Sequence, residues 1–365
     1  MSTYDLIVIG AGIVGAACAE QATAEGLKVA IVEPATVGGG ATAAAMGHLV
    51  AMDDDPAEFA LSRYSLGLWE AFAELPAAEF SRCGTLWVAS NDDELARIPD
   101  KLARLTDAGV VAEAVDAAGL YELEPMLAAD LRGGLLIRRE AVVYPPAVAR
   151  HLVDLALERG ATLHRQYAFR LQPGGVVLQD GGKLHGPVLV ATGCALPRLL
   201  PRLPIRARKG HLVITERYGQ RVNHQLLELG YADSAHGADA ASVAFNVQPR
   251  PTGQILIGSS REYDAADADV SMDMVRMMLQ RSFRFLPWLR ELDALRVWTG
   301  FRPVSTDGLP YLGRVPGMAD TWVAAGHEGL GVTTSLGSAR LLIDQLLGRP
   351  TAIDAAPYDP ARVAS

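Results

Sequence analysis

Short apolar runs separated by longer mixed stretches open the chain. Residues 5–9 form one such run and end at Gly10, and residues 29–32 form a second that ends in Glu33. Small and apolar residues between the two runs predict a helix over about 13–25. A strand, a helix and a second strand of these lengths predict a β-α-β unit whose two strands lie parallel.

The same pattern of apolar and polar residues predicts further helices and strands along the rest of the chain. Helices are predicted over 56–80, with a break at Pro76, and over 92–107, 147–159 and 272–287; strands are predicted over 84–89, 133–137, 161–164, 176–178 and 188–192. Strand-like runs within 210–260 predict an antiparallel sheet that forms a second layer. A buried strand, a glycine turn and an apolar helix end the pattern over 322–347. The chain therefore predicts a mixed α/β protein.

A glycine-rich turn joins the first strand to the first helix. Gly10 permits the tight turn, Gly12 allows a pyrophosphate to approach the backbone, and Gly15 lets the helix pack against the strand. The helix N-terminus, at Ile13 and Val14, favours the negative diphosphate through its free N–H groups and its dipole. Glu33 lies where an adenosine ribose would donate hydrogen bonds. An adenine dinucleotide is predicted, and FAD and NAD both remain possible on this evidence.

Length and charge narrow the class of protein. A chain of 365 residues predicts about two domains. A net charge of −9 argues against a nucleic-acid partner. No apolar run approaches the roughly 18–20 residues that span a bilayer, and no basic segment typical of a secretory signal precedes the first strand. The three cysteines form no CxxC motif and the histidines show no metal-ligand spacing, so we expect no metal and a reducing cytoplasm.

Two further segments are candidates for ligand contact. Residues 38–47 are almost all small, which would let the backbone lie against a large flat ligand; a flexible loop is the alternative. His48 follows, either as a polar group beside that ligand or as a packed loop histidine. The turn over 326–333 precedes the last helix, and its N-terminus suits a negative group such as a reduced isoalloxazine.

Taken in order, these landmarks resemble the glycine oxidase/D-amino-acid oxidase family of FAD enzymes over nearly the whole chain. The matching segments are Gly10–Gly15, Gly39–Gly47, Ala191–Gly193, Gln248–Gly258, Gly300–Pro303, Asp307–Pro310 and Gly326–Gly331. The segment Ala45–Leu49, followed by Met52–Asp55, is most similar to the bacterial D-hydroxyproline dehydrogenase branch.

The resemblance implies a two-domain α/β (α+β) fold of the glutathione-reductase type. A Rossmann-like FAD-binding domain is expected over 1–82, 141–208 and 298–365, and an antiparallel-sheet substrate domain over 83–140 and 209–297. Only one dinucleotide fingerprint is present, which favours FAD over NAD. The branch that binds flavin covalently through a C-terminal cysteine is not matched, because no cysteine follows Cys194. Non-covalent FAD is expected.

The family also assigns roles to several side chains. Arg302, in the Gly-x-Arg-Pro motif, would clamp the substrate carboxylate; a structural pairing with Asp307 or with a carbonyl is the alternative. Asn246 stands where the family often has a tyrosine, and its shorter side chain leaves room for a bulkier or ring-bearing substrate. Glu328-Gly329 replaces the arginine that glycine oxidase carries in this loop, which makes glycine a less suitable substrate.

His48 and His327 are the remaining polar candidates beside the flavin. Hydride transfer from the substrate α-carbon to flavin N5 needs a neutral amine and alignment more than a protein base. We expect His327 to orient the loop or the flavin, and His48 to interact with substrate or flavin. The expected cofactor contacts are Gly10, Gly12, Ile13, Val14, Gly15, Glu33, Gly40, Ala41, Thr42, Ala45, Met46, Gly47, His48, Phe169, Ala191, Thr192, Gly193, Gly300, Arg302, His327, Gly329, Leu330, Gly331, Val332 and Thr333.

The expected activity is FAD-dependent oxidation of the C–N bond of a D- or cyclic secondary amino acid to the imine. The resemblance favours cis-4-hydroxy-D-proline or D-proline. Alternatives are an N-substituted glycine such as sarcosine, glycine itself or an opine, and an FAD-bearing subunit that passes electrons to a partner protein; an NAD-dependent dehydrogenase is the weakest. Oxygen and a quinone of the respiratory chain both stay open as electron acceptor. A homo-oligomer, a partner subunit and a peripheral inner-membrane location also stay open.

Overall fold

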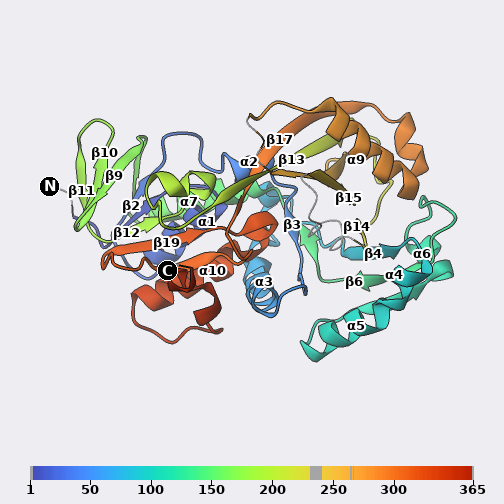
Figure 1. Ribbon diagram of the computed structural model, residues 1–365, viewed down its shortest axis with the longest axis horizontal. Coiled ribbons are helices and arrows are strands. Elements are labelled where there is room, and N and C mark those ends of the chain that lie inside the picture. Colours follow the sequence, from blue (N-terminus) through green and yellow to red (C-terminus); the bar gives the residue numbers. More distant parts are fainter. Residues whose placement is uncertain (1–2, 231–240, 264, 266, 364–365) are drawn as a thin grey trace.

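The computed structural model describes residues 3–230, 241–263, 265 and 267–363 (Figure 1). Two large sheets dominate the described chain, and Figure 1 shows them in opposite halves of the molecule. Strands of both sheets come from several separate parts of the sequence. The two-domain α/β architecture is therefore confirmed, while the domain boundaries stay a prediction.

The first sheet has six strands and contains the predicted β-α-β unit. Its order is β18 (Tyr311–Arg314), β19 (Thr321–Ala325), β12 (Val188–Val190), β1 (Leu6–Ile9), β2 (Val29–Val32) and β8 (Thr162–His164). All neighbours are parallel except β18 and β19. The strands β1, β2, β12 and β19 are buried throughout, which explains their continuous apolar sequence. The predicted helix is α1 (Ile13–Ala24).

Helices and a small sheet cover this sheet. On one face α1 packs against α7 (Pro145–Glu158) and α10 (Gly331–Leu346), and α10 packs against α3 (Pro56–Trp69). The helix α7 begins at Pro145, two residues before the predicted start, because proline suits the first turn of a helix. The other face packs on a three-stranded sheet of β11 (Lys183–His185), β10 (Gly175–Leu178) and β9 (Ala168–Gln172).

The second sheet has eight strands. Its order is β17 (Ala294–Val304), β13 (Arg206–Thr215), β16 (Ile255–Tyr263), β15 (Ala241–Pro249), β14 (Gln225–Glu228), β4 (Thr85–Ala89), β6 (Gly133–Ile137) and β5 (Glu113–Asp116). The expected antiparallel arrangement holds for every pair except β14 and β4, which run parallel. The helix α9 (Met272–Phe285) covers β15 and β16, and its buried Met274, Val275 and Met278 belong to the core.

Two predicted helices are shorter than expected. The stretch over 56–80 is helical only in α3, after which two 3₁₀ turns, Glu70–Phe72 and Pro76–Ala78, follow. The stretch over 92–107 divides at Arg97 into α4 (Asp92–Ala96) and α5 (Ile98–Asp107), because Pro99 lies in the first turn of α5. One further helix on this side, α6, spans Ala117–Leu123.

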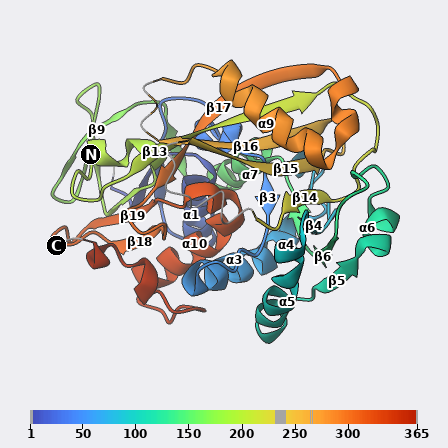
Figure 2. The same ribbon diagram turned by 45° about the vertical axis from the view of Figure 1, so that its right-hand side comes forward.

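Short elements connect the two halves. The helix α2 (Ala41–Ala44) packs on β17 and α7, and β3 (His48–Leu49) pairs with β7 (Ala141–Val142). Figure 1 places α2 and β3 between the two sheets, and Figure 2 shows β3 in the same place after rotation. Among the described helices, none combines the length and apolar composition that crossing a bilayer requires.

Candidate functional site

A large cavity lies where the two halves meet. Its volume is about 780 Å³, and both sheets contribute to its walls. From the first half come the glycine turn after β1, the end of β2 and the turns after β12 and β19. From the second half come β13, β15, β16 and β17. The carboxyl ends of parallel strands and one face of the antiparallel sheet therefore share one space.

The glycine turn after β1 lines the cavity and is tightly packed. A Cβ atom at Gly15 would lie 2.0 Å from the carbonyl oxygen of Gly10, so no other residue fits without backbone movement. Gly12 is the N-cap of α1 and makes no side-chain cap, and Ile13 N donates to Thr42 Oγ1 at 2.9 Å. The cradle and the helix N-terminus that a diphosphate needs are thus both present.

Glu33 is held in place at the end of β2. Its two carboxylate oxygens accept hydrogen bonds from Ala11 N and Ala35 N, each at 2.9 Å. The side chain is half-buried and lines the cavity. This places an oriented acid beside the glycine turn, as ribose recognition requires.

The small-residue segment after β2 is tied to both sheets. A Cβ atom at Gly300 would lie 2.3 Å from Ala44 Cβ, so α2 touches the backbone of β17. Gln248 Nε2 donates to Met46 O at 2.5 Å, and Thr333 Oγ1 donates to His48 O at 2.9 Å. These contacts favour a fixed backbone surface over a flexible loop.

The two candidate histidines are both kept neutral. Burial, with the nearby Arg250 charge as the second cause, lowers the pKa of His48 to about 4. Burial lowers the pKa of His327 to about 4, and its Nε2 lies 3.1 Å from Ser338 Oγ. His48 lines the cavity, and its Nε2 has no hydrogen-bond partner in the described chain. At pH 7 neither side chain carries charge.

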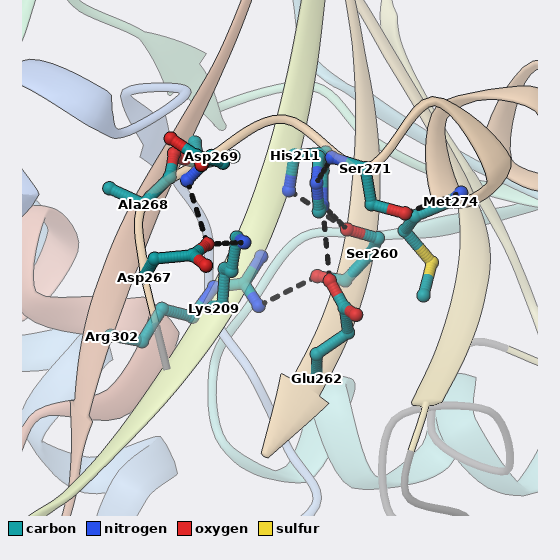
Figure 3. A network of polar contacts seen from close by, with 11 residues as sticks. Lys209, His211, Ser260, Glu262, Asp267, Ala268, Asp269, Ser271, Met274 and Arg302 are labelled. Carbon is teal, nitrogen blue, oxygen red and sulfur yellow. Dashed lines mark hydrogen bonds and ion pairs between the residues drawn. The ribbon is translucent and has the colours of Figure 1, made fainter. Parts of the chain in front are cut away.

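Arg302 lies in the wall formed by the second sheet. Its Nη1 donates to Ser260 O at 3.1 Å (Figure 3). A Cβ atom at Gly210 would lie 3.0 Å from Arg302 Nη2 and 3.2 Å from its Cζ, so the guanidinium rests on bare backbone of β13. Arg362 holds Asp307, with its Nε 2.7 Å from Asp307 Oδ2. Because a guanidinium has five N–H donors, the bond to one carbonyl is compatible with carboxylate binding.

Asn246 and Glu328 lie in the same cavity. Asn246 is only 2% exposed, and its Oδ1 has no hydrogen-bond partner among the residues that the structure describes. Glu328 has a positive φ of 50° and forms an ion pair with the buried Arg208 of β13. The negative charge of Glu328 is therefore balanced by an arginine of the second sheet.

Next to the cavity wall, a polar network joins β13 and β16 to the segment 267–271 (Figure 3). His211 Nδ1 lies 2.9 Å from Ser260 Oγ, and its Nε2 accepts a hydrogen bond from Ser271 N at 3.0 Å. Lys209 Nζ lies 3.4 Å from Asp267 Oδ1. Thr299 Oγ1 donates to the carbonyl of Ala268, which lines the cavity. The segment 267–271 is therefore fastened to the sheet that holds Arg302.

The structure brings nearly all of the expected contact residues together. All but four line the cavity; the exceptions are Gly15, Phe169, Leu330 and Thr333. Phe169 is 68% exposed, while its neighbours Tyr167 and Ala168 line the wall. The lining residues that sequence reasoning missed include Tyr167, Arg198, Gly210, Ser259, Arg261, Ala268 and Thr299. No motif marks them.

Comparison with known proteins gives consistent results. The family model described as "DAO: FAD dependent oxidoreductase" matches residues 5–345. A glycine oxidase of Pseudomonas aeruginosa is 29% identical over 98% of this chain and 98% of its own. The crystal structure of glycine oxidase from Geobacillus kaustophilus is similar with a TM-score of 0.89, 26% identity and 99% of each chain covered. That of iminodiacetate oxidase from Chelativorans sp. BNC1 has a TM-score of 0.84 at 25% identity, covering 97% and 98%.

Proposed function

The chain belongs to the DAO family of FAD-dependent oxidoreductases, and from this premise we propose that its substrate is a D- or cyclic secondary amino acid. FAD-dependent oxidation of an amino-acid C–N bond is the activity of the family members that the chain resembles. Our preferred substrate is cis-4-hydroxy-D-proline or D-proline. The product is the imine, which then rearranges or is hydrolysed by water.

The residues around the cavity fit FAD. The turn over Gly10–Gly15 and the N-terminus of α1 would hold the diphosphate, and Glu33 would hold the ribose. The fixed segment 40–48 and the turn over 327–332 would lie beside the isoalloxazine. Bound flavin supplies a hydride acceptor at N5.

The protein's own part in the reaction is binding and orientation. Arg302 binds the α-carboxylate, which fixes the α-carbon within the cavity. As the hydride leaves that carbon, the amine lone pair forms the C=N bond, so the amine must be neutral. His48 and His327 are uncharged at pH 7 and add no positive charge beside this nitrogen.

One observation carries the choice of substrate. Asn246 is buried in the cavity wall where the family often has a longer tyrosine, and it leaves space and an unsatisfied amide oxygen in the described structure. Glu328 occupies the loop position where glycine oxidase has an arginine, and Arg208 neutralises it. A larger, ring-bearing amino acid whose carboxylate is held by Arg302 alone suits this wall better than glycine does.

An N-substituted glycine or an opine is the second candidate. The similarity to an iminodiacetate oxidase favours it, because iminodiacetate is itself a secondary amine that carries carboxylates. Such a substrate would use the same Arg302 clamp. Activity on sarcosine or an opine, without activity on cyclic D-amino acids, would distinguish it.

Anaerobic bleaching of the flavin absorbance tests the proposal. The purified holoenzyme is mixed with D-proline, cis-4-hydroxy-D-proline, D-alanine, glycine, sarcosine or an opine, and air is then readmitted. We expect the cyclic D-amino acids to bleach the flavin fastest. Bleaching only by the other compounds would contradict the substrate assignment, and no bleaching by any amine would favour an electron-transferring subunit. The rate of recovery in air separates an oxidase from a dehydrogenase.

A further inference from the structure

We propose that Asn246, Ser259 and Arg261 form a second polar subsite that binds a hydroxyl group of the substrate, distant from its carboxylate. The inference rests on the proposed function, in which the cavity takes an amino acid. It adds the chemical group by which that amino acid is selected. None of the motifs in the sequence marks Ser259 or Arg261.

The three side chains come from two neighbouring strands of the cavity wall. Asn246 of β15 pairs in register with Gly258 of β16, the residue that precedes Ser259. Ser259 and Arg261 are two positions apart on β16, so their side chains leave the same face of the sheet. All three line the cavity, and their exposed fractions are 2%, 1% and 4% for Asn246, Ser259 and Arg261.

Two of the three side chains have unsatisfied polar atoms. Within the described chain, Asn246 Oδ1 and Ser259 Oγ have no hydrogen-bond partner. Buried polar atoms are nearly always paired, because leaving them unpaired costs free energy. Such atoms on a cavity wall indicate that a ligand provides their partners.

The donor and acceptor types identify that ligand group. An amide oxygen only accepts hydrogen bonds, and a guanidinium only donates them, whereas a serine hydroxyl does both. A substrate hydroxyl can donate to an acceptor such as Asn246 Oδ1 and can accept from a donor such as Ser259 Oγ or Arg261. A carboxylate can accept from Ser259 or Arg261 but cannot donate to Asn246 Oδ1. The set therefore favours a hydroxyl over a second carboxylate.

The position of Arg302 fits a compact substrate. Its guanidinium rests on Gly210 of β13 and donates to Ser260 O, so it reaches to β16 beside Ser259 and Arg261. The carboxylate clamp therefore reaches the strand that carries Ser259 and Arg261, so a compact substrate can contact both.

The test compares substrates that differ only by one hydroxyl. The pairs are cis-4-hydroxy-D-proline with D-proline, D-serine with D-alanine, and N-(2-hydroxyethyl)glycine with N-ethylglycine. For each pair, the ratio of kcat/KM is measured in the holoenzyme and in the variants Arg261→Met and Ser259→Ala. Arg296→Met is the matched control, because Arg296 is exposed on β17 outside the cavity lining. Flavin absorbance verifies that each variant is loaded.

We expect the natural chain to prefer the hydroxylated member of the pair that it oxidises best by at least about tenfold. Arg261→Met should bring this ratio close to one, because the substrate hydroxyl loses a hydrogen-bond donor. Ser259→Ala should lower the ratio less, and Arg296→Met should not change it. If Arg261→Met does not load with flavin, Arg261→Lys and Ser259→Ala replace it, and both should still lower the ratio.

Three results would overturn the inference. One is a ratio near one in the natural chain for every oxidised pair, and another is a ratio that Arg261→Met and Ser259→Ala leave unchanged. The third is oxidation of iminodiacetate alone, which would assign a second carboxylate to this wall. Failure of the proposed function can be told apart from failure of this inference. Sarcosine oxidation without proline oxidation would refute the ring-bearing substrate. The pair of N-(2-hydroxyethyl)glycine and N-ethylglycine would then still test whether the subsite binds a hydroxyl.

Discussion

The two ends of the cavity are built in different ways. The glycine-turn end comes from one continuous stretch, residues 6–33, in which a strand, a turn, a helix and a second strand follow each other. The wall that we propose for the substrate comes from β13, β15, β16 and β17, which span almost one hundred residues of sequence. Local geometry determines the first end, whereas strand pairing determines the second. We therefore expect substitutions to affect flavin binding and substrate binding separately.

The largest effect is expected at the glycine-turn end. Gly15→Val places methyl groups against the Gly10 carbonyl, where even a Cβ would lie at 2.0 Å, so the turn must move. Overpacking of this kind costs about 1–3 kcal/mol or more, and it distorts the cradle as well. The purified variant should lack flavin absorbance and have a lower Tm. A yellow, fully loaded Gly15→Val protein would show that the turn does not hold the cofactor.

Next in size is a substitution in the substrate wall. Arg302→Lys keeps the positive charge but loses the planar fork that grips a carboxylate, so KM for every amino acid should rise by about 10–100-fold. Flavin absorbance should stay at the level of the natural chain. Arg302 lies on the eight-stranded sheet, whereas the glycine turn follows a strand of the six-stranded sheet. Steady-state kinetics measures the change. An unaltered KM would remove Arg302 from the substrate site.

A smaller effect is expected at Gly210, beneath the guanidinium. Gly210→Ala brings a Cβ to 3.0 Å from both Arg302 Nη2 and Ser260 O, so Arg302 must shift by a few tenths of an ångström. KM should rise by about tenfold, because misplacing a positioning group of this kind is costly. Gly67→Ala is the control, since a Cβ at Gly67 meets nothing within 4 Å. Equal KM values for the two variants would show that Gly210 does not position Arg302.

The smallest effect is expected at the histidines. Their pKa values are lowered from 6.5 to about 4, so both remain neutral as pH rises from 5.5 and neither titrates above it. His48→Gln should therefore leave the inflections of kcat/KM between pH 5.5 and 9 where they are. A pH profile of the two proteins measures this. An acid limb near pH 6.5 that disappears in His48→Gln would contradict the neutral assignment.

The same contrast explains what could be predicted from the sequence. The strands β1 and β2, the helix α1 and the position of Glu33 follow from local patterns, because the chemistry of a diphosphate turn needs glycines at fixed spacing. Arg302 could be placed only by resemblance. Its surroundings, Gly210 and Ser260, come from other strands, and their proximity depends on a sheet register that a single sequence does not encode.

Phe169 shows the limit of carrying a position over by resemblance. It alternates with Ala168 along β9, so one side chain faces the cavity region and the next faces solvent. A shift of one residue in a strand exchanges the two faces. Phe169 is expected at the cavity and does not line it, whereas Arg261 lines the cavity and is not expected there. In the sequence, this buried arginine cannot be told from any charged residue near the end of a strand.

The most direct test of the separation between the two ends is ligand binding to one variant. Pyrrole-2-carboxylate, a flat ring that cannot be oxidised at an α-hydrogen, is titrated into the natural chain and into Arg302→Ala while flavin absorbance is recorded. We predict a spectral shift whose Kd rises by about 30–1,000-fold in Arg302→Ala, the loss of a buried charge-assisted pair, with the flavin fully retained. Equal Kd values in the two proteins, or loss of flavin from Arg302→Ala, would contradict the account.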